Sequence, residues 1–325
     1  MVTGGAGFIG SSLVRALVRR GYLVRVVDDF SSGRRENLAD LGTTVGLDGT
    51  GPIQGGVGSV EIVEGTILDD ACLDQAFSHA DVVFHHAAIP SVSRSIANPV
   101  ASHEVNATGT LTVLEAARRA GVRRIVYAAS SSAYGETPTL PKVETMACAP
   151  LSPYAVAKLA GEHYCQVYAR VFGLETVILR YFNVFGPRQD PASPYAAVLP
   201  LFITAALEKR PPTIYGDGSQ SRDFCFVDNV VAANVLAADA KDVSGQIFNV
   251  ACGARTSLGD VVRLLGEIVG WQIEPRYQPS RAGDIKHSLA DISKARTMLG
   301  YTNPIPFAVG LERTITWYRE KSRHA

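Results

Sequence analysis

The chain has 325 residues, of which 46% are apolar and 19% charged, a composition that excludes a disordered or fibrous protein. Its length predicts two structural units, on a scale of about 150 residues per domain. Lys plus Arg equals Asp plus Glu at 31 each, so no excess positive charge points to nucleic acid or a membrane surface as a partner. Apolar runs stay well short of the roughly 20 residues that span a bilayer, and the N-terminus lacks a signal-peptide pattern. We therefore expect a cytoplasmic location.

A glycine-rich turn opens the chain. The run Thr3-Gly4-Gly5-Ala6-Gly7-Phe8-Ile9-Gly10 contains the motif G-x-G-x-x-G. In addition, Gly4, Gly7 and Gly10 follow one another at intervals of three residues. Such glycines permit a sharp turn, close approach of backbone to a pyrophosphate and tight packing of helix on strand, and a helix starting near Phe8 would aim its N–H groups at the phosphates. Only Met1 to Thr3 precede the turn, so the first strand is either short or cut by the start of the chain as given.

Asp28 ends the next predicted strand, Leu23 to Val27. An acidic side chain there can accept hydrogen bonds from a ribose 2′-hydroxyl and repels a 2′-phosphate. The turn and this acid together predict NAD, rather than NADP, as the cofactor.

Further apolar runs without polar alternation predict buried strands at 82–84, 125–127 and 177–179. Amphipathic stretches at 11–20, 106–120 and 154–172 predict the helices between them. This alternation is typical of an α/β fold of the Rossmann type, with a doubly wound parallel sheet. The segment from Gly42 to Gly58 is rich in glycine, and we interpret it as a flexible surface loop.

Prolines crowd the chain after about Arg180, where we expect a smaller substrate lobe to begin. The residues leading to Phe248-Asn249-Val250 are expected to return to the sheet. The predicted division is 1–180 plus 224–253 for an NAD-binding domain, and 181–223 plus 254–325 for a C-terminal substrate lobe.

No metal site is expected. The five cysteines form no C-x-x-C pair and are expected to be reduced and inert. His85 and His86 are adjacent on a strand, so their side chains point to opposite faces and cannot hold one metal together.

The catalytic residues are expected on the helix that begins at Pro153. Ser152 is a favourable N-cap and Pro153 a favourable first residue, while Tyr154 and Lys158 are four residues apart and therefore share one helix face. A nearby cation stabilises a phenolate and lowers the tyrosine pKa, as a general base requires. Ser130-Ser131-Ser132 follow the strand at 125–129, at the edge where open α/β sheets bind ligands. A hydroxyl there can hydrogen-bond the substrate oxygen; the pattern does not say which serine does so.

With these motifs the chain resembles the extended short-chain dehydrogenase/reductase family over essentially its whole length, and within it the UDP-sugar 4-epimerases. The resemblance extends through the stretch Leu179 to Arg188 and the motifs Gly216-Asp217-Gly218, Arg222-Asp223 and Arg281-Ala282-Gly283-Asp284. It implies interconversion of C4 epimers through a 4-keto sugar, a bound NAD and a homodimer. It also implies an NAD site formed by Gly4, Gly7, Phe8, Ile9, Gly10, Asp28, Asp29, Ser31, Gly33, Thr66, Ile67, Ala87, Ala88, Asn106, Ser130, Tyr154, Lys158 and Phe182.

The same resemblance implies a UDP-sugar site formed by Ser131, Ser132, Asn183, Ala197, Val198, Tyr215, Arg222, Arg281, Asp284 and Ser288. One departure concerns adenine, because Thr66 stands where family members carry an aspartate. Ser288 stands where a large aromatic residue would exclude an N-acetyl group, so acetylated and non-acetylated UDP-hexoses are both expected substrates.

Three alternatives stay open at this point. A 4,6-dehydratase shares the fold and the first step, but family members with that activity carry an Asp-Glu pair where this chain has Ser131 and Ser132. A UDP-pentose or UDP-uronate 4-epimerase would use the same residues on a different sugar. A nucleotide-sensing scaffold without catalysis would keep the fold, but usually not both Tyr154 and Lys158.

Overall fold

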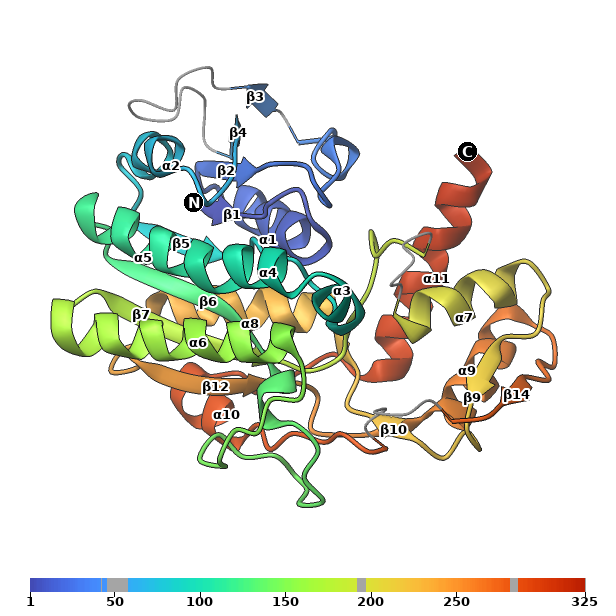
Figure 1. Ribbon diagram of the computed structural model, residues 1–325. Helices are drawn as coiled ribbons and strands as arrows, with labels where there is room; N and C mark the ends of the chain where they lie inside the picture. Colours follow the sequence, from blue (N-terminus) through green and yellow to red (C-terminus); the bar gives the residue numbers. More distant parts are fainter. Residues whose placement is uncertain (42, 46–57, 192–196, 281–285, 325) are drawn as a thin grey trace.

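The computed structural model describes residues 1–41, 43–45, 58–191, 197–280 and 286–324. Within them, an eight-stranded sheet lies at the centre of the larger part of the molecule, in the order β12-β7-β6-β5-β1-β2-β4-β3 with every neighbouring pair parallel (Figure 1). The strands are β1 (Val2–Thr3), β2 (Val24–Asp28), β3 (Thr43–Val45), β4 (Val60–Glu64), β5 (Val82–His85), β6 (Arg124–Ser130), β7 (Glu175–Tyr181) and β12 (Gln246–Val250). The strand order reverses between β1 and β5, which is the doubly wound α/β fold predicted from the sequence.

Helices cover both faces of this sheet. On one face lie α1 (Phe8–Arg19) and α8 (Val227–Asp239), which pack together; on the other lie α2 (Asp70–Phe77), α5 (Gly109–Arg119) and α6 (Pro153–Val167). Neighbouring residues of β6 alternate between the two cores: Val126 packs with the α1 side, and Ile125 and Tyr127 pack with the α5 side. Burial on both faces explains the apolar runs of β5 and β6, Val82–Phe84 and Ile125–Ala129.

Two of the predicted helices are extended by π-helical turns. The turn Glu104–Thr108 joins α4 (Pro99–His103) to α5, and the turn Tyr168–Phe172 continues α6. Short α3 (Val92–Ala97) precedes α4, and 3-10 turns occupy Arg35–Asn37 and Ser131–Tyr134. Within the part of the chain that the structure describes, no helix is both long and apolar enough to cross a bilayer.

The smaller lobe has its own apolar core, beside the sheet in Figure 1. Phe185, Phe202, Phe226, Val261 and Leu311 are buried together in it. Its elements are α7 (Val198–Leu207), α9 (Leu258–Val269), α11 (Phe307–His324) and the strand pairs β8 (Val184–Phe185) with β11 (Cys225–Phe226), β9 (Thr213–Tyr215) with β14 (Arg276–Gln278), and β10 (Ser221–Arg222) with β13 (Thr256–Ser257).

The chain returns to the sheet as expected, because α8 packs on it and β12 pairs with β7. A second return was not predicted. Ala290 to Tyr301, including α10 (Ser293–Leu299), pack their apolar side chains into the core of the sheet, although the sequence division placed them in the smaller lobe. The Gly42–Gly58 interpretation is wrong at Thr43–Val45, which pair with β4 as β3; residues 42 and 46–57 lie outside the described residues.

Candidate active site

The glycine turn brings backbone segments into contact. A Cβ on Gly10 would lie 2.1 Å from the Gly4 carbonyl oxygen, and one on Gly4, which has a φ of +67°, would lie 2.7 Å from the Ala87 nitrogen. At the N-cap of α1, Gly7 has no side chain to cover the first N–H groups of the helix, and Phe8 and Ile9 begin its first turn. Backbone of this shape fits the pyrophosphate of a dinucleotide.

Asp28 connects this turn to the end of β2. Its carboxylate accepts hydrogen bonds from the backbone nitrogens of Ala6 (2.8 Å) and Phe30 (2.9 Å). Burial raises the pKa of Asp28, and the two backbone donors oppose that rise. Gly33 lies against the carboxylate, since a Cβ there would be 2.6 Å from Oδ1. Asp29 and Ser31 complete the loop through hydrogen bonds from the Ser31 N–H and hydroxyl to the Asp29 carboxylate.

Asn106 lies in the π-helical turn before α5 and is fully buried. Its amide accepts a hydrogen bond from the Ile89 nitrogen (2.8 Å) and donates to the Ile89 oxygen (3.1 Å). Asn106 thus fixes the backbone just after Ala87 and Ala88. Beyond β4, Thr66 accepts a bond from the Leu68 nitrogen and Ile67 is buried.

The two histidines diverge, as the sequence predicts. His85 lies between the hydroxyls of Thr3 (2.8 Å) and Thr110 (3.1 Å), whereas Nε2 of His86 lies 3.0 Å from the Tyr181 hydroxyl. Burial lowers the pKa of both rings, that of His86 to about 4. Both imidazoles are therefore neutral near pH 7. Among the described residues, no group of three or more His, Cys, Asp or Glu side chains could hold a metal ion.

Ser130 ends β6, and Tyr154 and Lys158 lie four residues apart on α6, which packs against that strand. The helix begins as predicted at Pro153, and the Ser152 hydroxyl accepts a hydrogen bond from the Ala155 nitrogen at 3.2 Å. Ser130 lies close enough to the Tyr154 hydroxyl to lower its pKa. Ser132 donates to the same Ser130 hydroxyl at 2.8 Å, and Ser131 opens the following 3-10 turn. Ser130 is therefore the serine of the triplet that the structure brings to Tyr154.

The pKa of Tyr154 differs from the expectation. Burial raises it, and the nearby Ser130 only partly offsets that rise. Lys158 is itself buried, which lowers its pKa to about 8, and its ammonium lies 4.8 Å from the centre of the Tyr127 ring. The motif shows the cation but cannot show the loss of water around the phenol, which is the larger influence in this structure.

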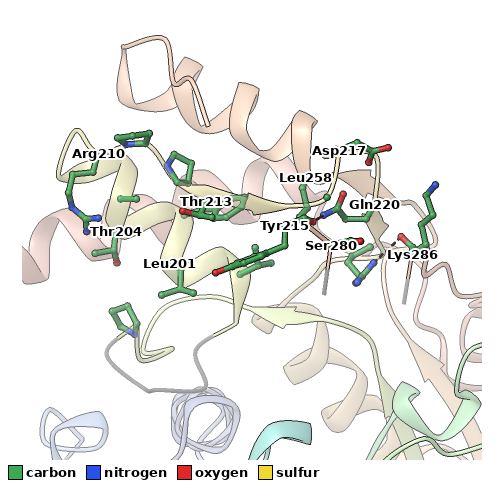
Figure 2. A pocket seen from close by; sticks show the side chains of 18 residues that line it. Leu201, Thr204, Arg210, Thr213, Tyr215, Asp217, Gln220, Leu258, Ser280 and Lys286 are labelled. Carbon is green, nitrogen blue, oxygen red and sulfur yellow. Dashed lines mark hydrogen bonds between the residues drawn. The ribbon is translucent and has the colours of Figure 1, made fainter. Parts of the chain in front are cut away.

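A cavity of about 930 Å³ opens in the smaller lobe (Figure 2). It is lined by three of the predicted substrate residues, Val198, Tyr215 and Arg222, and by residues that the sequence reasoning missed, among them Leu201, Thr204, Gln220, Ser280 and Lys286. The Arg222 guanidinium donates to the backbone oxygens of Ser221 (3.0 Å) and Lys286 (3.1 Å), which orient it. Ala197 is the exposed N-cap of α7.

Two of the remaining predicted residues, Phe182 and Asn183, directly follow β7. Asn183, with a φ of +33°, donates to the Asp223 oxygen (3.3 Å), and Phe182 is buried against the Tyr134 ring. Ser288 donates its N–H to the Ser221 oxygen at 3.0 Å. Arg281 and Asp284 lie outside the described residues.

Comparison with known proteins assigns the chain to a family. Residues 1–251 match the model of the NAD dependent epimerase/dehydratase family. A UDP-glucose 4-epimerase of Mycolicibacterium smegmatis is 40% identical over 325 residues, which cover 99% of each chain.

Two solved structures are also similar. One is a UDP-N-acetylglucosamine 4-epimerase from Methanobrevibacter ruminantium in complex with UDP-N-acetylmuramic acid, with a TM-score of 0.89, 37% identity and coverage of 98% of this chain and 97% of that one. The other is a UDP-glucose 4-epimerase from Thermotoga maritima with UDP-glucose, with a TM-score of 0.88, 36% identity and coverage of 99% and 98%. The protein described here belongs to the NAD-dependent epimerase/dehydratase family.

Proposed function

We propose that this protein inverts the C4 hydroxyl of a UDP-hexose through a transient 4-keto sugar, with NAD bound. The observation that carries the proposal is the contact of Tyr154 with Ser130 beside the buried Lys158, at the sheet edge that also carries the glycine turn. A base, a hydroxyl donor and a cation at the carboxyl end of a parallel sheet suit removal of a proton from an alcohol.

The residues have distinct tasks in this proposal. Tyr154 takes the proton of the C4 hydroxyl, Ser130 hydrogen-bonds the same oxygen, and Lys158 stabilises the phenolate through its charge. When bound, NAD would supply the acceptor, and later the donor, of the hydride at C4. Tyr154 gives the proton back to the oxygen after the keto sugar has presented its other face, so no hydride or proton is consumed overall.

Substrate binding is proposed for the smaller lobe. Arg222 is oriented by two backbone oxygens in the wall of the cavity, where a guanidinium can bind a diphosphate through charge-assisted hydrogen bonds. Firm binding at UDP leaves the sugar free to turn. The proposed substrate contacts are Ser131, Ser132, Asn183, Ala197, Val198, Tyr215, Arg222, Arg281, Asp284 and Ser288.

For the cofactor we propose contacts from the glycine turn, the loop after Asp28 and the ends of β4, β5, β6 and β7. Ala87 and Ala88 would contact it from the segment that Asn106 fixes, so we assign Asn106 a positioning role. Asp28, at the end of β2, favours NAD over NADP.

The rival reactions differ at the sugar. Dehydration needs an acid and a base beyond Ser130, and this chain offers the hydroxyls of Ser131 and Ser132, one of which already donates to Ser130. A uronate or pentose 4-epimerase would use the same Tyr154. We favour hexoses, acetylated or not, because a serine at position 288 is small.

We further propose a homodimer in the cytoplasm. Large apolar side chains are exposed on neighbouring helices, Ile96 on α3 (65%) and Val156 (50%) and Val167 (47%) on α6, which is typical of an interface between copies. For the domain division we propose the boundaries predicted from the sequence, with Ala290–Tyr301 moved to the NAD-binding side because they pack in the sheet core.

The proposal is tested by incubating the purified protein with UDP-glucose, UDP-galactose and their two 2-acetamido counterparts, and by separating the C4 epimers. We expect interconversion with no net change in NAD. Stoichiometric NADH, or a 6-deoxy-4-keto product, would contradict the proposal.

A further inference from the structure

Asp223 is a buried carboxylate whose described partners are backbone N–H groups. It is fully buried between Arg222 of β10 and the start of β11. Its oxygens accept hydrogen bonds from the backbone nitrogens of Cys252 (2.9 Å), Gly253 (3.1 Å) and Ala290 (3.2 Å). A carboxylate in such surroundings is kept only where it has several donors, because burial of a charge is costly.

Its three partners belong to two other segments of the chain. Cys252 and Gly253 follow β12, the edge strand of the sheet. Ala290 lies in the segment 287–291, which is hydrogen-bonded on one side to Ser221 and on the other to Lys142 through the pairs Ser288–Ser221 and Asp291–Lys142. One carboxylate therefore joins the lobe strand that carries Arg222, the end of the sheet and the segment that carries Ser288.

We infer that Asp223 is a positioning residue that fixes the spacing between the diphosphate site at Arg222 and the sugar site at Ser288. The inference rests on the proposed function for the identity of the two sites. Neither site needs Asp223 as a contact. What Asp223 sets is whether one ligand can reach both sites at once.

Two ligands separate this role from a purely structural one. UDP engages the Arg222 side alone, whereas a UDP-hexose also needs the Ser288 side. The ratio of the dissociation constant of the UDP-hexose to that of UDP therefore reports the alignment of the two sites. A general loss of stability would weaken both ligands by the same factor.

The variant Asp223→Asn places an amide NH₂ against backbone N–H groups. It therefore removes one hydrogen-bond acceptor from the place where the three segments meet. We expect the ratio of dissociation constants, measured by calorimetry on the NAD-loaded protein with UDP and UDP-glucose, to rise at least about tenfold, which corresponds to 1.4 kcal/mol. UDP affinity should change less than about threefold.

Tyr301→Phe is the matched control. The Tyr301 hydroxyl donates to the Ala251 oxygen (2.9 Å) at the same end of β12, but it does not reach the 287–291 segment through that bond. We expect its ratio to equal that of the wild type, although the variant also loses a buried hydrogen bond.

If Asp223→Asn does not fold, the same ratio of dissociation constants is measured on Gly253→Ala. Gly253 has a φ of +71°, so alanine strains the backbone and displaces one donor of the joint while leaving the carboxylate in place. A ratio that rises supports the inference; an unchanged ratio, or equal losses for both ligands, overturns it. The ratio of dissociation constants does not require epimerisation, so absence of epimerisation by the wild type would count against the proposed function alone.

Discussion

The proposed cofactor side of the site and its proposed substrate side differ in how much of each is carried by local motifs. On the cofactor side, Tyr154 and Lys158 share one helix, and the bond from Ala6 to Asp28 joins residues 22 positions apart. On the substrate side, the segment that carries Ser288 is joined to the residue after Arg222 by the bond from Ala290 to Asp223, across 67 positions. The proposed catalytic pair is therefore carried by one short motif, whereas the proposed substrate contacts come from segments that only the complete fold aligns.

The largest effect is expected on the cofactor side, from Tyr154→Phe. Removal of the hydroxyl deletes the base and keeps the ring, so kcat should fall by about 10² to 10⁴ while NAD content stays constant. The rate is measured by separation of C4 epimers. Tyr164→Phe, on the same helix with an exposed ring, is the control and should be fully active. Retention of more than about a tenth of wild-type turnover by Tyr154→Phe would exclude Tyr154 as the base.

A second test breaks the glycine turn. A Cβ on Gly10 would lie 2.1 Å from backbone, so Gly10→Ala must push β1 and α1 apart. Overpacking typically costs about 1 to 3 kcal/mol, and with backbone as the neighbour we expect the upper end, roughly a hundredfold weaker NAD binding by fluorescence titration. Gly259→Ala, in the first turn of α9, is the control. A Cβ there would lie 3.7 Å from its nearest neighbour, the Gly218 oxygen, which is an ordinary contact distance. Similar NAD affinity in both variants would argue against the turn as the pyrophosphate site.

On the substrate side, Ser288→Tyr sharpens the question of specificity. A bulky ring beside the C2 substituent should lower kcat/KM for UDP-N-acetylglucosamine and UDP-N-acetylgalactosamine by roughly 5- to 150-fold. The non-acetylated pair serves as the internal control and should be spared. Equal losses for both pairs, in a protein with an unchanged circular dichroism spectrum, would show that Ser288 does not limit the C2 substituent.

The smallest effect is expected from pH. Burial lowers the pKa of Lys158 to about 8, so the ammonium is charged below that pH and loses its proton above it. The raised pKa of Tyr154 means that its phenolate fraction grows with pH; because the proposed role of the Lys158 charge is to stabilise that phenolate, the rise of kcat/KM should level off above pH 8. Lys158→Arg keeps its charge and should shift this levelling to higher pH, even though its maximal rate is lower. A wild-type profile that keeps rising to pH 10 would contradict the role of Lys158.

The same contrast explains which features could be predicted from the sequence. The four strands read from apolar runs are β2, β5, β6 and β7, and the cap at Ser152 placed the start of α6 at the right residue. These signals are local, since periodicity and capping depend on residues within a few positions.

What escaped prediction depends on tertiary contacts. The edge strand β3 lies in a glycine-rich stretch with little pattern, and Ala290–Tyr301 join the sheet core from the far end of the chain. The rise in the Tyr154 pKa follows from burial, which a motif cannot report. Asp223 was visible as part of a motif, but the three N–H groups that it collects come from positions 252, 253 and 290.

Backbone hydrogen bonds hold the segment 287–291 to both the smaller lobe and the sheet. Ser288, Ala290 and Asp291 each donate their amide hydrogen to a fixed acceptor, Ser221, Asp223 and Lys142 respectively, although they lie outside every helix and extended strand. These amides can exchange with deuterated water only when the segment separates from the lobe or from the sheet. Their exchange rates would therefore measure how often the two parts of the molecule come apart, and a bound UDP-sugar that bridges them should slow the exchange.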